Sequence, residues 1–237
     1  MNRDTGNVLL ILVGGAILRI SVGDTFLRYV RGGLQIPLLL AGATLVLLGL
    51  LSLWRENPGR GRQPAEDGHG HAHGNRVAWL LLLPVFAIFL IAPPALGSYA
   101  ADRSTVSRVP PAASNYPPLP AGDPLAMRLD EYEARAVWDA GRNMSDRTFK
   151  LIGFVTERPG GGYYLTRIVI SCCAADATAV RIQVTGTAGS YRPDTWIEVV
   201  GHYDGLDHSR EKDLGPVAIV RADSVRQIDP PREPYET

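Results

Sequence analysis

Two long runs without a charged residue most constrain what this chain can fold into. Residues 34–54 and 77–101 contain no Asp, Glu, Lys or Arg. A helix needs about 20 mostly apolar residues to cross the hydrocarbon core of a bilayer, and both runs reach that length. Residues 8–22 form a shorter apolar run, in which Arg19 can extend to the headgroups; an interfacial helix is the alternative here. The predicted membrane spans are residues 7–23, 34–54 and 77–97.

Small residues in the first two runs favour close packing of two helices. The segments 14–18, GGAIL, and 38–50, LLLAGATLVLLGL, hold glycine and alanine, which allow neighbouring backbones to approach. No small-residue cleavage site closes the first run, so we expect it to be retained rather than removed as a signal peptide. We therefore predict a multi-pass protein of the cell membrane, whose helical hairpin contacts the lipid bilayer and a larger membrane partner.

Arginines flank the predicted spans and bear on the orientation in the membrane. Five lie on each side once the three spans are drawn, so their total does not decide the orientation. The densest group lies in the loop 55–76 and consists of Arg55, Arg60, Arg62 and Arg76. We expect this loop to face the cytoplasm and the C-terminal domain to be extracytoplasmic.

The loop 55–76 also carries a histidine-rich tract, EDGHGHAHGNR, at residues 66–76. His69, His71 and His73 alternate with Gly and Ala, and imidazole is a ligand for zinc, copper and nickel. Short His-rich tracts are typical of metal binding. The alternative is a solvated, low-complexity loop that binds metal only weakly. The three histidines are candidate metal ligands on this basis.

The composition changes sharply after the third apolar run. The net charge is zero, from 24 basic and 24 acidic residues, but the first hundred residues are mostly apolar and the rest are polar and charged. Residues 102–127 are rich in proline and small polar residues, which favour extended chain over a buried core. We predict a transmembrane region at 1–101, a linker at 102–127 that holds the next domain away from the bilayer, and a soluble domain at 128–237.

The soluble domain shows one helix pattern and five strand patterns. Residues 129–141 have helical periodicity and end at Gly141. Apolar and β-branched segments between glycine-rich turns predict strands at 148–157, 163–171, 179–186, 195–204 and 215–228. Together with the apolar runs, these patterns predict a membrane-anchored α + all-β protein, in which about three transmembrane helices precede a small OB-like β-barrel domain.

The strand order resembles the OB-fold, a five-stranded Greek-key barrel; an SH3-like or other small barrel is the alternative. Residues 194–203, DTWIEVVGHY, and 220–228, VRADSVRQI, are similar to the fourth and last strands of many OB domains. OB domains often bind single-stranded nucleic acid through a basic groove with stacking aromatics. Because residues 128–237 contain 14 basic and 17 acidic residues, we predict no nucleic-acid binding.

Two adjacent cysteines, Cys172 and Cys173, are the only ones in the chain, and Asp176 follows them. In a regular strand one thiol would enter the core and the other would face outward, so packing is one interpretation. A bend at the strand end would instead present both thiols to one ion, since zinc accepts Cys, His and Asp ligands. His202 and His208 are candidates to complete that site. A vicinal disulfide is the third interpretation, which needs a strained ring and an oxidising compartment.

The cysteine segment also carries a family resemblance. Residues 167–184, RIVISCCAADATAVRIQV, resemble the hallmark Cys-Cys-x-x-Asp-Ala segment of the YcgQ-like family of bacterial membrane proteins. DTWIEVVGHY and the later DPPREPY, residues 229–235, are similar to further segments of that family. The resemblance implies association with a separate multi-spanning permease and, in some bacteria, a link to zinc limitation. The family pattern covers both cysteines and Asp176, and their assignment to a metal site is our inference.

Three functions are compatible with these patterns. The first is an accessory subunit of a membrane permease that binds or hands over zinc or another thiophilic ion. The second is a membrane-tethered thiol oxidoreductase, although such enzymes usually space their cysteines as Cys-x-x-Cys. The third is a structural adaptor without metal. The sequence shows no Ser-His-Asp set, phosphate-binding loop or carboxylate dyad, so we predict that the chain is not an enzyme.

Overall fold

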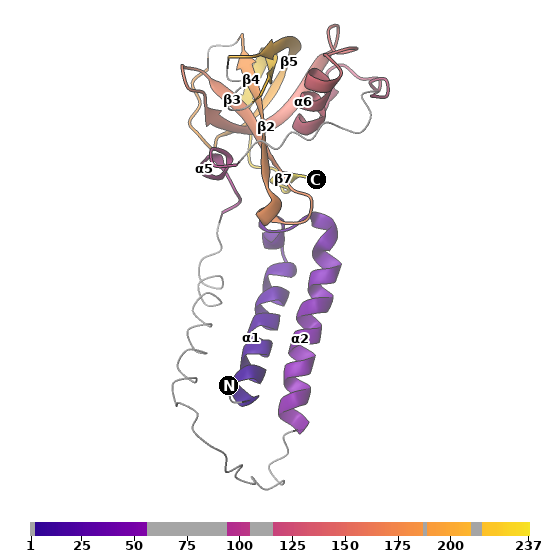
Figure 1. Cartoon of the computed structure of the whole chain (residues 1–237), viewed down its shortest axis with the longest axis vertical. Coiled ribbons are helices and arrows are strands. Elements are labelled where there is room, and N and C mark those ends of the chain that lie inside the picture. Colours follow the sequence, from indigo (N-terminus) through magenta and orange to yellow (C-terminus); the bar gives the residue numbers. More distant parts are fainter. Residues whose placement is uncertain (1–2, 56–93, 105–115, 187–188, 210–214) are drawn as a thin grey trace. The chain divides into compact units, whose positions relative to one another are not determined.

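The computed structural model describes residues 3–55, 94–104, 116–186, 189–209 and 215–237 (Figure 1). The chain divides into two compact units, Met1–Pro94 and Ala95–Thr237. The second unit therefore starts well before residue 128, where the sequence predicts the soluble domain to begin. The candidate ligands His69, His71 and His73 lie outside the described residues.

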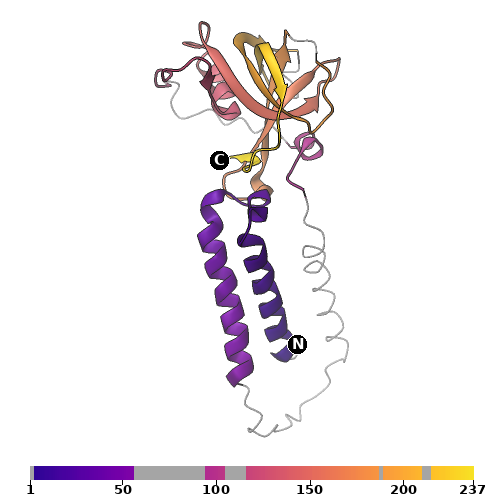
Figure 2. The same ribbon diagram turned by 180° about the vertical axis from the view of Figure 1, so that it is seen from behind.

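The first unit contains a hairpin of two helices that lie side by side (Figures 1 and 2). Its elements are α1 (Arg3–Ser21), the 3-10 helices η1 (Thr25–Arg28) and η2 (Gly32–Leu34), and α2 (Gln35–Arg55). A Cβ atom at Gly14 would lie 2.8 Å from the carbonyl oxygen of Gly42, and one at Gly49 would lie 2.6 Å from the side chain of Ile11. The close packing that the small residues predict is therefore present.

Within the described residues, one helical segment, Gly32–Arg55, is long and apolar enough to cross a membrane, with a mean hydropathy of 2.4. Only 11% of its apolar window is buried in the structure, unlike the core helix of a soluble protein. By length and composition this segment fits a membrane span or a signal sequence. It coincides with the span predicted at 34–54.

The structure confirms neither of the other two predicted spans. The span at 7–23 falls on α1, whose apolar part, Gly6–Ser21, is shorter than a full crossing needs. The span at 77–97 lies mostly outside the described residues, and from Ala95 onward it belongs to the second unit. The described part of the chain thus holds one helix of membrane-spanning length and not the three predicted.

The second unit contains a five-stranded closed barrel with short additional strands. Its elements are α5 (Ser98–Ala101), β1 (Leu125–Ala126), α6 (Leu129–Trp138), β2 (Thr148–Glu157), β3 (Tyr163–Val169), η3 (Ala174–Asp176), β4 (Thr178–Thr185), β5 (Trp196–Asp207), β6 (Val217–Gln227) and β7 (Tyr235–Glu236). The predicted helix and all five predicted strands are present.

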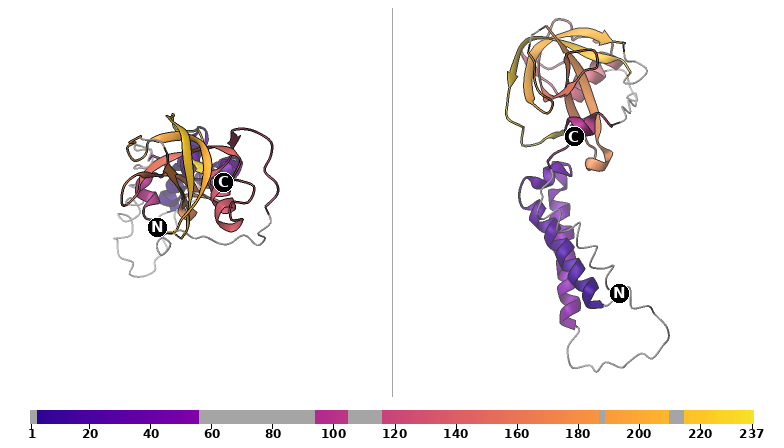
Figure 3. Two further views of the ribbon diagram at one scale, coloured as in Figure 1. Left: turned by 90° about the horizontal axis from the view of Figure 1, so that it is seen from above. Right: turned by 90° about the vertical axis from the view of Figure 1, so that its left-hand side faces the viewer.

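Strands β2 to β6 pair into the closed ring, which curls around its interior in both views of Figure 3. β2 pairs antiparallel with β3 and with β5, and the pairs β3–β4 and β5–β6 are also antiparallel. β4 and β6 pair in parallel and close the ring. β1 extends the sheet beside β2, and β7 beside β3. This arrangement is compatible with the predicted OB-like domain.

Apolar side chains on the inner faces of the strands fill the barrel, and α6 covers it at one side. α6 contacts all five barrel strands, and its Leu129 and Tyr132 are fully buried. The Tyr132 ring meets Phe149 edge to face, with 5.2 Å between the ring centres, and its hydroxyl donates to the carbonyl of Ile219 at 3.1 Å. The helical periodicity at 129–141 thus reflects burial against the barrel core.

A second apolar cluster lies apart from this core and includes the segment 95–104. Ala95, Leu96 and Ala101 pack there with Phe154 and Tyr235. The Leu96 N–H donates to the Tyr235 hydroxyl at 2.9 Å. The segment that the sequence assigns to a membrane span and a tether is therefore part of the barrel unit.

Two polar contacts fasten the same segment. Asp194 accepts hydrogen bonds from the N–H and the hydroxyl of Ser98, at 2.6 and 2.8 Å. Arg181 donates to the carbonyl of Ala101 and is buried, although it alternates with the inward-facing residues of β4. The segment 95–104 covers this outer side of the strand, and for that reason the residue is not exposed.

Most of the predicted linker also contacts the barrel where the structure describes it. Arg135 donates to the carbonyl of Pro117 at 2.9 Å, and Arg147 donates to those of Pro120 and Gly122 at 2.9 and 2.7 Å. Proline cannot donate a backbone hydrogen bond, but carbonyls in an extended chain are free to accept one from arginine. Residues 116–127 are therefore a covering of the barrel and not a free tether.

Candidate functional site

The two cysteines lie in a loop between β3 and β4. β3 ends at Val169, two residues before the predicted end, so both cysteines lie beyond the strand. The chain then turns through η3 before β4 begins at Thr178. The alternation that would send one thiol into the core does not apply, because neither cysteine lies within β3 or β4. We call residues 171–176 the thiol loop.

The two thiols lie next to each other and are accessible. Their Sγ atoms are 3.6 Å apart, and both cysteines are free. Cys172 is exposed and Cys173 is half-buried, and neither belongs to an apolar cluster. Core packing is therefore wrong as an interpretation of this pair, which lies outside both apolar clusters with Cys172 exposed to solvent.

Asp176 holds the thiol loop in shape. Its two carboxylate oxygens accept the backbone N–H groups of Ser171 and Cys172, at 3.0 and 2.8 Å. Its own N–H donates to the carbonyl of Cys173 at 3.0 Å. These hydrogen bonds, with that from Cys172 first among them, lower the pKa of Asp176. The carboxylate is thus ionised near neutral pH and lies beside the thiols.

The same carboxylate changes the chemistry of Cys172. Hydrogen bonding of its thiol to Asp176, and then to Cys173, raises the pKa of Cys172 to about 11. A neighbouring negative charge disfavours the thiolate, so Cys172 is a thiol at neutral pH. Any ion that binds here has to displace this proton.

The structure brings together Cys172, Cys173 and Asp176, and it does not place His202 or His208 with them in a metal site. His202 lies in β5, where one ring nitrogen is 3.2 Å from the carbonyl of Arg147 and the other is 3.1 Å from Asp223. His208 follows β5 and is exposed. Among the described residues, no group of three or more His, Cys, Asp or Glu side chains is placed so that it could hold a metal ion.

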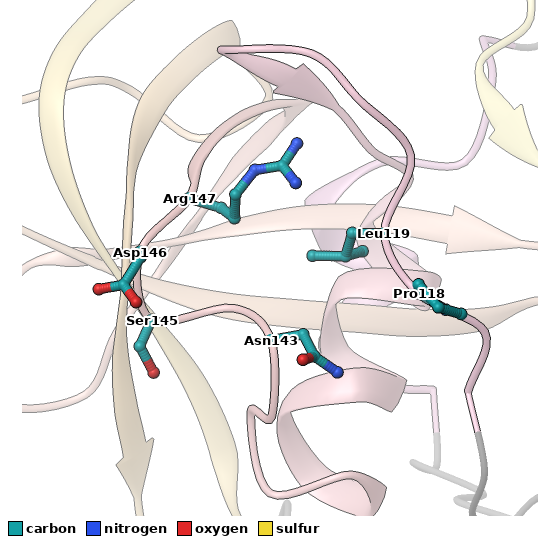
Figure 4. Close-up of a pocket in the computed structure, with 6 residues that line it drawn as sticks. All are labelled: Pro118, Leu119, Asn143, Ser145, Asp146 and Arg147. Atoms are coloured by element: carbon teal, nitrogen blue, oxygen red, sulfur yellow. The ribbon is translucent and has the colours of Figure 1, made fainter.

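A pocket of about 440 Å³ opens elsewhere on the barrel, between the turn after α6 and the covering segment, residues 116–127 (Figure 4). Its lining residues are Pro118, Leu119, Asn143, Ser145, Asp146 and Arg147. The guanidinium of Arg147 already binds two backbone carbonyls of the covering segment. Its charge therefore stabilises that segment, which leaves the thiol loop as the candidate site.

A buried ion pair beside the end of β3 was not predicted. Glu236, in β7, accepts the N–H groups of Leu129 and Asp130 at 3.0 and 3.1 Å and so caps α6. Its Oε1 lies 3.6 Å from Nε of Arg167. Burial raises the pKa of Glu236 and lowers that of Arg167. β7 has only two residues and pairs with a distant strand, so no local pattern indicates it.

The fold and the site define a small closed β-barrel domain that carries an exposed dithiol loop. Residues 136–236 of the chain match the DUF1980 C-terminal domain, a family of unknown function. The match covers the barrel strands and the thiol loop. A comparison with curated proteins finds no match.

Proposed function

We propose that this chain is a membrane-anchored accessory subunit of a multi-spanning permease, and that its thiol loop binds zinc or another thiophilic ion and hands it over. The observation that carries the proposal is the pair of accessible Sγ atoms 3.6 Å apart. Two sulfurs bound to one tetrahedral zinc ion at about 2.3 Å each lie about 3.8 Å apart. The loop therefore needs little rearrangement to place both sulfurs on one ion.

Two thiolates leave the coordination of the ion incomplete. A structural zinc site is closed by four protein ligands, whereas a site with open positions exchanges its ligands readily. The Asp176 carboxylate fixes the loop, and its remaining lone pairs face the Cys172 thiol, which hydrogen-bonds to it. An open site of this kind suits transfer of an ion to a partner better than permanent storage.

The membrane anchoring rests on the apolar helices. Segment Gly32–Arg55 has the length and hydropathy of a span, and α1 packs against it through Gly14, Gly42 and Gly49. Large apolar side chains on α2 remain exposed, Leu40 and Leu47 among them, and lipid tails or helices of a permease would cover them. The proposed topology is multi-pass with an extracytoplasmic barrel, and the proposed role is not catalytic.

Zinc binding to the full-length protein in detergent tests the site. The three loop histidines, His69, His71 and His73, are first replaced by Gln, so that weak binding there cannot obscure the result. We expect one zinc ion per chain in this background. The double substitution Cys172→Ser with Cys173→Ser should abolish binding, while Ser171→Ala, a matched change in the same loop, should leave it intact.

Three results would count against the proposed site. These are no zinc in the His-substituted protein, zinc that survives loss of both cysteines, and zinc that is lost when His202 is replaced by Gln. In addition, a stable disulfide between the two cysteines in protein isolated without reductant would favour the redox function instead.

Purification in mild detergent tests the partnership. We expect a multi-spanning membrane protein to co-purify with the full-length chain. A chain that purifies alone and moves an ion across reconstituted vesicles by itself would contradict the subunit role. A reporter that is active only in the cytoplasm, fused after Thr237, should stay silent if the barrel is extracytoplasmic.

A further inference from the structure

In the sequence, the third apolar run continues without a break into the barrel unit. From Val77 to Pro94 it counts 18 residues and carries no charge. Eighteen residues in a helix extend about 27 Å, close to the hydrocarbon thickness of about 30 Å. The barrel unit begins at the next residue, Ala95. A membrane span drawn from this run therefore ends where the barrel begins.

The first residues of the barrel unit are firmly attached to it. Leu96 is held by the Tyr235 hydroxyl, and Ser98 by both oxygens of Asp194. Ala101 is fully buried, and its carbonyl accepts from Arg181. Because these contacts begin two residues after Pro94, only Ala95 would separate a membrane span that ends at Pro94 from the first of them.

Helix α5 and the turn after it present an exposed aromatic and basic pair. Tyr99 is 71% exposed. The guanidinium of Arg103 stacks 3.6 Å from the centre of the Tyr99 ring and donates to the Tyr99 carbonyl at 3.3 Å. Arg192 is exposed two residues before Asp194, the residue that holds Ser98. Besides Asp194, the acidic neighbour is Asp102, whose side chain is 59% exposed and lies 4.0 Å from Arg181.

We propose that Tyr99 and Arg103 seat the barrel on the headgroup layer of the bilayer. Tyrosine is enriched at this depth because its ring is apolar and its hydroxyl is polar, and arginine extends its charge there along an apolar stem. The occupant is the lipid interface, since α5 begins four residues after Pro94. The inference rests on the proposed membrane anchoring, and it replaces the predicted tether with direct contact.

Photo-crosslinking in the full-length protein, reconstituted in lipid nanodiscs, tests this contact. p-Benzoylphenylalanine replaces Tyr99 in one variant and Arg103 in a second, so that a folding failure at one position does not end the test. The matched control is Arg142, which is 69% exposed and follows α6. α6 and the turn after it lie on the opposite side of the barrel from α5 in Figures 1 and 2. A fourth probe replaces Leu47 in α2.

We expect lipid adducts at positions 47, 99 and 103 and no lipid adduct at position 142. Lipid at position 47 without lipid at 99 and 103 would overturn the seating and leave the membrane anchor intact. Adducts of positions 99 and 103 with a protein would also overturn it and would identify this face as a protein interface. Equal lipid labelling at 142 would show that contact with lipid is not specific to α5. No lipid at position 47 would overturn the membrane anchoring itself, and the seating with it.

Discussion

At the end of β3 two adjoining stretches of chain have opposite environments. Residues 168–170 are covered by β7: Ile168 pairs with Tyr235, and the N–H of Ile170 donates to the carbonyl of Glu236 at 2.9 Å. The thiol loop begins at the next residue, Ser171, and is exposed. The change from buried strand to open loop thus takes place within one residue.

The contrast assigns different tasks to the two stretches. β7 fixes the strand end through burial, hydrogen bonds and an ion pair, whereas the thiol loop is shaped by one carboxylate that binds backbone N–H groups. Accessible thiols on a rigid support can bind an ion without reorganising the barrel. We therefore expect changes in β7 to alter stability and changes in the loop to alter thiol chemistry, and the following predictions test that separation.

The largest effect is expected for Tyr235→Ala. The ring is 4% exposed and its hydroxyl holds Leu96, so the substitution leaves a cavity and an unpaired N–H. Loss of a large buried aromatic side chain typically destabilises a protein by about 3 kcal/mol or more. Tyr235→Phe is the matched control and should lose only the hydrogen bond, about 1 kcal/mol. Chemical unfolding of the detergent-solubilised protein measures both, and equal losses would show that the ring packing contributes little.

A smaller effect is expected at Glu236. Glu236→Ala removes the cap of α6 and should cost about 1 kcal/mol, the usual value for a helix cap. Glu236→Gln keeps the shape but not the charge. Since burial raises the folded-state pKa above the ordinary 4.5, the stability that the carboxyl group contributes is fully present below 4.5 and is lost as the pH rises through the raised value.

Melting curves of wild type and Glu236→Gln between pH 4 and pH 7 measure this dependence. The advantage of wild type over the Gln variant should shrink as the pH rises. An advantage that grows with pH would mean that attraction to Arg167 outweighs the cost of burying the charge. The pKa of Glu236 would then be lowered in the folded protein and not raised.

No measurable change in melting temperature is expected when Cys172 and Cys173 are both replaced by Ser. Cys172 is exposed and Cys173 is only half-buried, so serine loses little packing and can bind water. Substitutions on the surface usually have small effects. A clear drop in the melting temperature would show that the thiol loop also contributes to stability, contrary to the proposed division of tasks between the loop and β7.

The last prediction concerns reactivity rather than stability. Because the pKa of Cys172 is raised to about 11, its alkylation by iodoacetamide should keep accelerating beyond pH 9, the ordinary pKa of a thiol. Asp176→Asn removes the carboxylate that causes the shift and should speed alkylation at pH 8. Asp207→Asn, which removes a carboxylate outside the loop, should not. A rate that levels off near pH 9 in wild type would contradict the assigned effect of Asp176.

The sequence predicts the barrel well and its attachments poorly. The strand at 148–157 and the helix at 129–141 are indicated by local patterns of apolar and β-branched residues, and the structure confirms both. The segment 95–104 and β7 have no such pattern, because their places depend on contacts such as that between Leu96 and Tyr235, 139 positions apart. An apolar run alone does not show whether its last residues enter lipid or pack on a protein.

The thiol loop could be predicted in part. Adjacency in the sequence brings Cys172, Cys173 and Asp176 together, and the structure places them in one turn. Neither thiol is in the core because β3 ends at Val169, where its pairing with both β4 and β7 stops, and the sequence does not indicate β7. The proposed approach of His202 fails for a similar reason, since its ring nitrogens lie against Arg147 and Asp223.

The cap that Glu236 places on α6 joins residues 107 positions apart. A ribosome makes α6 before any of the five barrel strands and long before Glu236. The helical hairpin depends on local contacts and forms early, whereas contacts between distant segments form slowly. Biogenesis therefore has an order in which α1 and α2 assemble first and the barrel closes last. Until β6 pairs with β4, the newly made domain exposes its apolar strands, and we expect this stage of its folding to be the most prone to aggregation.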